Sequence, residues 1–109
     1  AWHYENDSET GLSYLANEDQ AQGTSFQSLV EDQGNGGDES SAGELHLFNP
    51  SSTTYVKHFY ARFAALNGPE HGSDQFIAGY INDTTAIDDI QFKFSSGNFD
   101  GTIKMWGVK

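Results

Sequence analysis

Cysteine is absent from this 109-residue chain, and basic residues are scarce. Without cysteine, neither a disulfide framework nor a thiolate metal site can stabilise the fold. Only five Lys and Arg residues stand against 16 Asp and Glu residues, which gives a formal charge of -11. This charge opposes binding to nucleic acid and to anionic lipid, so we expect neither partner.

Long apolar runs are also missing. No stretch approaches the roughly 18 apolar residues that a membrane helix needs, so we expect no membrane partner. The first residues, Ala1 to Tyr4, lack the basic start and apolar centre of a signal peptide. Because the chain opens without Met in a strand-like stretch, we expect residues 1–109 to be one domain, the C-terminal part of a longer or processed protein.

Aromatic residues and glycine are abundant instead. The chain has 14% aromatic residues and twelve Gly, a balance that favours strands and turns over helices. We therefore expect a mostly β domain with aromatic side chains in much of its core.

The charge is unevenly distributed along the chain, because residues 1–44 contain no Lys or Arg.

The clearest strand signal covers residues 53–63. Residues Tyr55, Phe59, Ala61 and Phe63 alternate along one side together with Lys57, and this side is the better candidate for the core. The opposite side is more polar and carries His58, Tyr60 and Arg62.

Further alternation predicts strands at 44–48 and 76–81 and a final hairpin within 90–109. Weaker signals lie at 11–16 and 24–30, and a short helical turn is expected at 83–90. Residues 31–43 contain no large apolar side chain, so we expect a long loop outside the core. These seven or eight strands, with at most one helical turn, predict an all-β fold, an antiparallel β-sandwich of jelly-roll type.

Three stretches resemble a known series of motifs: FNPSSTTYVKHFYARF at 48–63, IAGYINDTTAIDDIQFKFSSGN at 77–98 and GTIKMWGV at 101–108. They are similar to the C-terminal β domains of marine tailed-phage virion proteins. The resemblance covers roughly residues 45–109. Two departures, a shorter turn at Phe99 to Gly101 and Trp106 in place of Tyr, leave the turn type open but not the fold.

The resemblance implies a non-enzymatic virion structural module at the particle surface: part of a fibre, an appendage or a capsid decoration. Such a module acts by oligomeric assembly with itself, a homotrimer being favoured, and with other virion proteins. An alternative is a tip domain that binds a host-surface receptor or glycan. On that alternative, the polar side of the long strand, with His58, Tyr60 and Arg62, is the expected binding surface, since aromatic rings stack on sugars.

Signals for chemistry are weak. The four histidines have no metal-ligand spacing, and no G-x-S-x-G nucleophile elbow occurs, so we expect no enzyme. No cofactor is expected apart from one open alternative. The oxygens of Asp32, Asp38 and Glu39 lie among glycines and are of the kind that bind calcium, although a solvated loop is the favoured explanation of this stretch.

Overall fold

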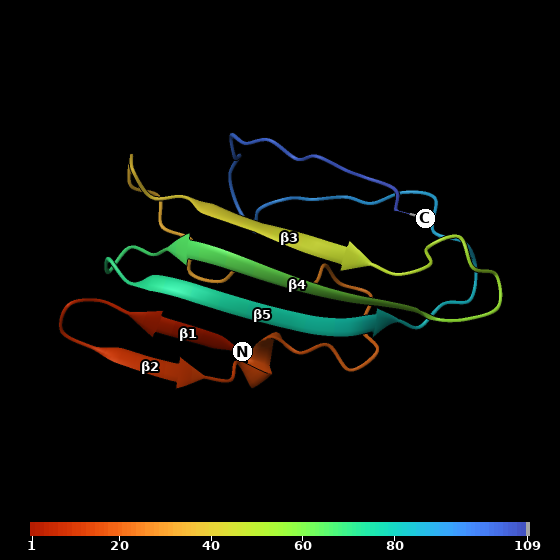
Figure 1. Ribbon diagram of the computed structural model, residues 1–109, viewed down its shortest axis with the longest axis horizontal. Helices are drawn as coiled ribbons and strands as arrows, with labels where there is room; N and C mark the ends of the chain where they lie inside the picture. The colour runs from red at the N-terminus through yellow and green to blue at the C-terminus, as the bar shows by residue number, and fades with distance from the viewer. Residues whose placement is uncertain (109) are drawn as a thin grey trace.

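The computed structural model describes residues 1–108, which form a single antiparallel sheet of five strands (Figure 1). The strands are β1 (Trp2–Glu5), β2 (Thr10–Ser13), β3 (Ser41–Leu47), β4 (Lys57–Leu66) and β5 (Gly72–Ile81), and the 3-10 turn η1 spans Ala16–Glu18. Their order across the sheet is β2-β1-β5-β4-β3. The predicted all-β antiparallel class is confirmed, whereas the predicted count of seven or eight strands is wrong for the described residues.

The β4 and β5 strands form the long hairpin on which the other strands are arranged. They pair from Lys57 opposite Ile81 to Leu66 opposite Gly72. Asn67 closes the turn, because its Oδ1 accepts the N–H of His71 at 2.9 Å and its own N–H donates to the His71 carbonyl at 3.1 Å. The turn is short, and β5 begins at Gly72, before the start of the strand predicted at 76–81.

One face of the sheet is covered by loops. On β4 the odd-numbered positions are the buried ones, as the alternation predicted, with Lys57 and Ala61 fully buried and Ala65 7% exposed. Ser73 and Gln75 of β5 are buried on the same face. The fully or nearly buried positions are thus small or polar, and the aromatic side chains on this face, such as Phe59 and Phe63, are only half-buried.

The loop between β2 and β3 covers part of this face. Gln75 donates its side-chain N–H to the Glu31 carbonyl at 2.8 Å and accepts the Glu31 N–H at 2.7 Å. Gly34 donates to the Leu66 carbonyl at 3.2 Å. No residue of 31–43 is fully buried, although Glu31 and Gln33 are half-buried, and the predicted long loop is shorter than expected because Ser41–Gly43 open β3. Buried amide groups, rather than apolar side chains, attach this loop.

Residues 82–108 contain no strand, so the predicted hairpin within 90–109 is not formed in the described residues. The segment still runs out and back on the β3 side of the sheet (Figure 1). Its beginning is attached to the sheet: the buried Lys57 ammonium donates to the Asp83 carbonyl at 3.0 Å and to the Thr85 carbonyl, and Ile87 donates to the Pro50 carbonyl at 2.9 Å.

Other local predictions also shift. The helical turn expected at 83–90 is replaced by a tight turn, in which the Asp83 carboxylate accepts the Thr85 N–H at 2.6 Å, and the observed 3-10 turn lies at Ala16–Glu18. Residues 24–30 form no strand. None of the helical segments in residues 1–108 has the length or apolarity to cross a membrane.

A second sheet is absent from residues 1–108, so the structure shows no closed sandwich in the described residues. The radius of gyration of 15.4 Å exceeds the about 13 Å expected of a compact chain of this length. The overall dimensions of 49 × 28 × 28 Å are those of an elongated molecule. The other side of the sheet is open, and the candidate site lies there.

Candidate functional site

The open face of the sheet carries a group of aromatic and imidazole rings from three adjacent strands. Even-numbered positions of β4 and β5 point to this face, together with the even-numbered positions of β3. We call the group the aromatic cluster; it consists of His46, Phe48, His58, Tyr60, Phe76 and Tyr80.

Tyr60 is the centre of the aromatic cluster. Its ring stacks on His46, with centroids 4.7 Å apart and planes 15° apart, and on Phe76 at 6.1 Å and 20°. Phe48 lies tilted against Tyr60 at 5.8 Å. The strand register explains this stacking, because His46 is directly opposite Tyr60, and Phe76 is the diagonal neighbour of Tyr60 on β5.

The cluster is exposed to solvent although it is apolar. Phe48 is 49% exposed, Phe76 48% and Tyr80 51%. His58 and Tyr80 face each other across β4 and β5, with ring centroids 6.1 Å apart. Large aromatic rings gathered on one open sheet face form the kind of contiguous apolar patch that marks an interaction site.

The three binding residues predicted from the sequence lie on this face. His58 and Arg62 are exposed, and Tyr60 is half-buried within the cluster. Their role in binding stays a prediction. The sequence did not predict that four further residues belong to the same surface: His46, Phe48, Phe76 and Tyr80. The alternation in 44–48 and 76–81 was the pattern from which they could have been identified.

A charged pair adjoins the cluster. The Arg62 guanidinium donates two hydrogen bonds to the Asp74 carboxylate, at 2.9 and 2.7 Å. This hydrogen bonding holds the pKa of Asp74 below its usual value, and the same contact raises the pKa of Arg62. Beyond the pair, small residues such as Ala42 and Ala64 line a shallow, open hollow. Along the strands, the side chains of the open face therefore change from aromatic to charged and then to small residues.

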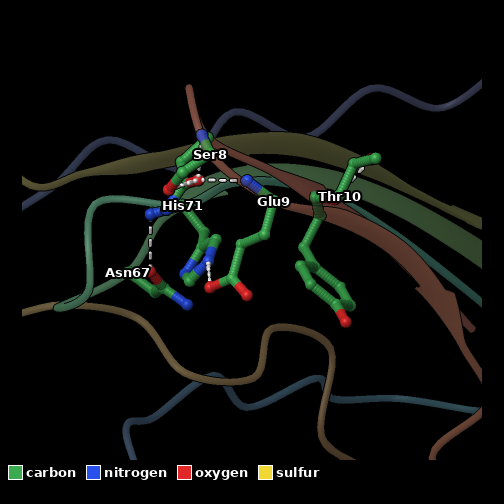
Figure 2. A network of polar contacts seen from close by, with 7 residues as sticks. Ser8, Glu9, Thr10, Asn67 and His71 are labelled. Atoms are coloured by element: carbon green, nitrogen blue, oxygen red, sulfur yellow. Dashed lines mark hydrogen bonds and ion pairs between the residues drawn. The ribbon is translucent and has the colours of Figure 1, made fainter.

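A second polar cluster joins two turns at one end of the sheet (Figure 2). The Glu9 carboxylate lies 2.6 Å from Nε2 of the His71 ring, and Asn67 holds the backbone of His71. The neighbouring Ser8 hydroxyl donates to the Asn6 side chain at 3.1 Å rather than approaching the imidazole. The arrangement connects the β1–β2 turn to the β4–β5 turn.

The calcium prediction has no ligand set in the structure. Across residues 1–108, no group of three His, Asp or Glu side chains is arranged to hold a metal ion. The Glu39 carboxylate accepts the N–H of Gly36 within the loop, and Asp32 has a left-handed backbone with φ of 54°. Asp32, Asp38 and Glu39 are therefore not brought together, and calcium binding stays a prediction from the sequence.

Comparisons with known proteins give no assignment. No protein-family model matches the chain, and no curated protein or solved structure is significantly similar to it. The function must therefore be argued from the open face and the motifs.

Proposed function

We propose that this protein is a non-enzymatic structural module that assembles through the open face of its sheet. The observation that supports this most directly is the exposed aromatic cluster. In one chain the cluster has no cover, whereas a second sheet placed on it supplies the missing layer of a β-sandwich. On this proposal the predicted sandwich closes between copies of the chain rather than within one copy.

Burial of the aromatic cluster contributes favourably to association. An aromatic side chain offers about 200 Å², so the half-exposed rings of Phe48, Phe76 and Tyr80 expose roughly 300 Å² per copy. At about 25 cal/mol per Å², burying this area contributes about 7 kcal/mol per copy. Association costs on the order of 4 to 15 kcal/mol, so faces from two or more copies must contribute together.

We further propose the virion of a tailed phage as the place of assembly, in a fibre, an appendage or a capsid decoration. The motif resemblance over residues 45–109 supports this, and a homotrimer is the favoured state because phage appendages are commonly oligomeric. Three open faces around a threefold axis satisfy the same need for cover as two faces in a dimer. Other virion proteins are the expected further partners.

The test is the molar mass in solution. Light scattering across a concentration series, with and without calcium, should give a stable mass of three times the 12.0 kDa chain, or another fixed multiple. A mass of one chain at every concentration, up to the highest soluble one, contradicts assembly through this face.

The second candidate function is binding of a host-surface glycan. The observation that favours it is the position of the Arg62 and Asp74 pair beside exposed rings, because sugars are held by stacking on aromatic faces and by hydrogen bonds to charged groups. The charge of -11 disfavours anionic polysaccharides, so neutral oligosaccharides are the first probes. A chain that is monomeric and binds such a sugar by calorimetry, with loss of binding in Tyr60→Ala, supports this candidate over assembly.

A further inference from the structure

The last part of the described chain has a strand pattern but no strand partner. Residues 101–108 are all exposed, and their apolar members are among the most exposed in the structure: Met105 is 73% exposed, Trp106 75% and Val108 93%. Ile103 and Met105 alternate with Thr102 and Lys104. Such alternation is typical of a strand with one buried face, and here neither face is buried.

The preceding leg is attached to its own sheet. Lys57 binds the carbonyls of Asp83 and Thr85, and the Lys93 ammonium lies 4.2 Å from the centre of the Phe26 ring. Phe94 then stacks on Phe99 with centroids 5.0 Å apart. The segment up to Phe99 thus contacts its own chain, whereas residues 101–108 extend beyond these contacts.

The outer edge of β3 is a free template for another strand. Phe48 donates to the His58 carbonyl at 2.9 Å and Leu66 to the Ser40 carbonyl at 3.1 Å, so the even-numbered residues of β3 pair with β4. The odd-numbered ones, Ser41 to Leu47, point their N–H and C=O groups outward. Within residues 1–108, no backbone hydrogen bond joins this edge to another segment. Unpaired edges of this kind readily accept a strand from another chain.

We propose that residues 101–108 of one copy add as a strand to the outer edge of β3 of a second copy. The lengths agree, because β3 has seven residues and the segment has eight. The two-residue alternation of side chains in this segment also matches that of β3. A register that sets Ile103 and Met105 on the face of Leu45 sets Lys104 on the face of Glu44, in either strand direction.

Charge complementarity favours a second copy as the partner of this segment. Residues 101–108 contain Lys104 and no acidic residue, whereas residues 1–44 contain ten acidic residues and no Lys or Arg. β3 follows this acidic stretch and exposes Glu44. Lys104 of one copy therefore meets Glu44 at the β3 edge of the next, while the summed charge of the copies repels them elsewhere.

The added strand also enlarges the open face. In the same register Trp106 lies on the open face of the sheet, the face that also carries His46 and Phe48. The inference thus deepens the proposed assembly and rests on it: the open face supplies the apolar contact, and the exchanged strand fixes which copies are neighbours.

Zero-length coupling tests the contact without altering the chain. Unlabelled and ¹⁵N-labelled proteins are mixed, equilibrated and treated with a carbodiimide, which joins a lysine amine to a carboxylate only when the two touch. We expect a Lys104–Glu44 linked peptide that carries both labels, at about ten times the yield of any mixed-label peptide from Lys93. Lys104→Arg, which keeps the charge but cannot be coupled in this way, should remove that peptide.

The outcomes separate this inference from the proposed assembly. A Lys104–Glu44 peptide that never carries both labels means that the segment pairs with its own β3, which overturns the inference. Absence of the peptide in a protein that light scattering shows to be oligomeric also overturns it and leaves assembly through the open face standing. A chain that is monomeric throughout overturns both.

A charge exchange supplies the second measurement. Lys104→Glu should raise the dissociation constant about tenfold at low salt, and mixing it with Glu44→Lys should restore the association. Lys93→Glu makes the same charge change on the attached leg and is the matched control. Equal weakening by Lys104→Glu and Lys93→Glu, with no recovery in the mixture, means that only net charge matters and contradicts the strand exchange.

Discussion

Phe76→Ala tests whether the open face is the surface of assembly. Phe76 lies on β5 within the aromatic cluster, stacked on Tyr60, and is 48% exposed in the single chain. Burial of the exposed half of a ring of about 200 Å² removes roughly 100 Å² from water, or about 2 kcal/mol per copy after allowing for the alanine that remains. In a symmetric contact both copies lose this term, about 4 kcal/mol, so the dissociation constant should rise by about a thousandfold.

The assay is sedimentation equilibrium or light scattering over a concentration series. Tyr55→Ala is the matched control, because Tyr55 is 70% exposed but lies in the loop between β3 and β4, away from the cluster. Loss of the Phe76 and Tyr60 stacking also destabilises the sheet itself, by about 0.5 kcal/mol, so circular dichroism must show that the variant is folded. The reasoning is wrong if folded Phe76→Ala associates as well as the unaltered protein, or if Tyr55→Ala weakens association equally.

Three further predictions concern charge and the attachment of the chain. Raising NaCl to about 0.5 M, where the Debye length is about 4 Å, should strengthen assembly of this acidic chain, and a dissociation constant that rises with salt would show that ion pairs dominate. The Asp74 carboxyl should titrate by ¹³C NMR below its usual value of 3.8, and Arg62→Gln should raise its pKa. Because folding lowers the pKa of Asp74, the contribution of the Arg62–Asp74 pair to stability is present above about pH 4 and is lost as the pH falls through the lowered pKa. An unchanged titration of Asp74 in Arg62→Gln contradicts this role of Arg62. Lys57→Met should lower the free energy of unfolding in urea by about 2 kcal/mol and speed hydrogen exchange near residues 83–87, because two carbonyls lose a charged donor; unchanged exchange there would show that Lys57 does not attach the segment.

The long hairpin could be predicted from the sequence because its signal is local. Alternation along 53–63 identified the buried side of β4 correctly, from Phe59 to Phe63. The start was wrong, since the Ser52 hydroxyl accepts the N–H groups of Thr54 and Tyr55 at 3.2 and 3.0 Å, and this turn delays β4 until Lys57. A side-chain turn of this kind competes with a strand and leaves the alternating pattern unchanged.

The open face could be predicted only in part. The polar character of one side of β4 indicated that His58, Tyr60 and Arg62 face outward. The stacking of His46 and Phe76 on Tyr60 depends on the registers of β3 and β5 against β4, and these are set by turns and pairings that a single strand pattern does not contain. The cluster is therefore a property of three strands together.

The same limit explains the final hairpin. Residues 90–94 and 102–106 alternate as clearly as β4 does, yet they form no strand in the described chain. An alternating pattern predicts that one face of a strand is buried, but it does not identify the chain that covers this face. A strand without a partner leaves its backbone N–H and C=O groups unpaired and buries no side chains. The alternating segment therefore forms no strand until the edge of another strand is available.

These features together connect the fold to its assembly. Among residues 1–108 the buried apolar side chains are only Ala61 and Ala65, while large apolar side chains remain exposed on the open face and in residues 101–108. A chain of this length usually buries roughly two thirds of its unfolded surface, and its stability comes mainly from that burial. If partner copies provide the missing burial, association and folding are linked, and the free energy of unfolding rises with protein concentration. A midpoint of thermal unfolding that increases steadily from low to high micromolar concentration is the expected sign of that linkage, and a midpoint independent of concentration would mean that the single sheet is stable on its own.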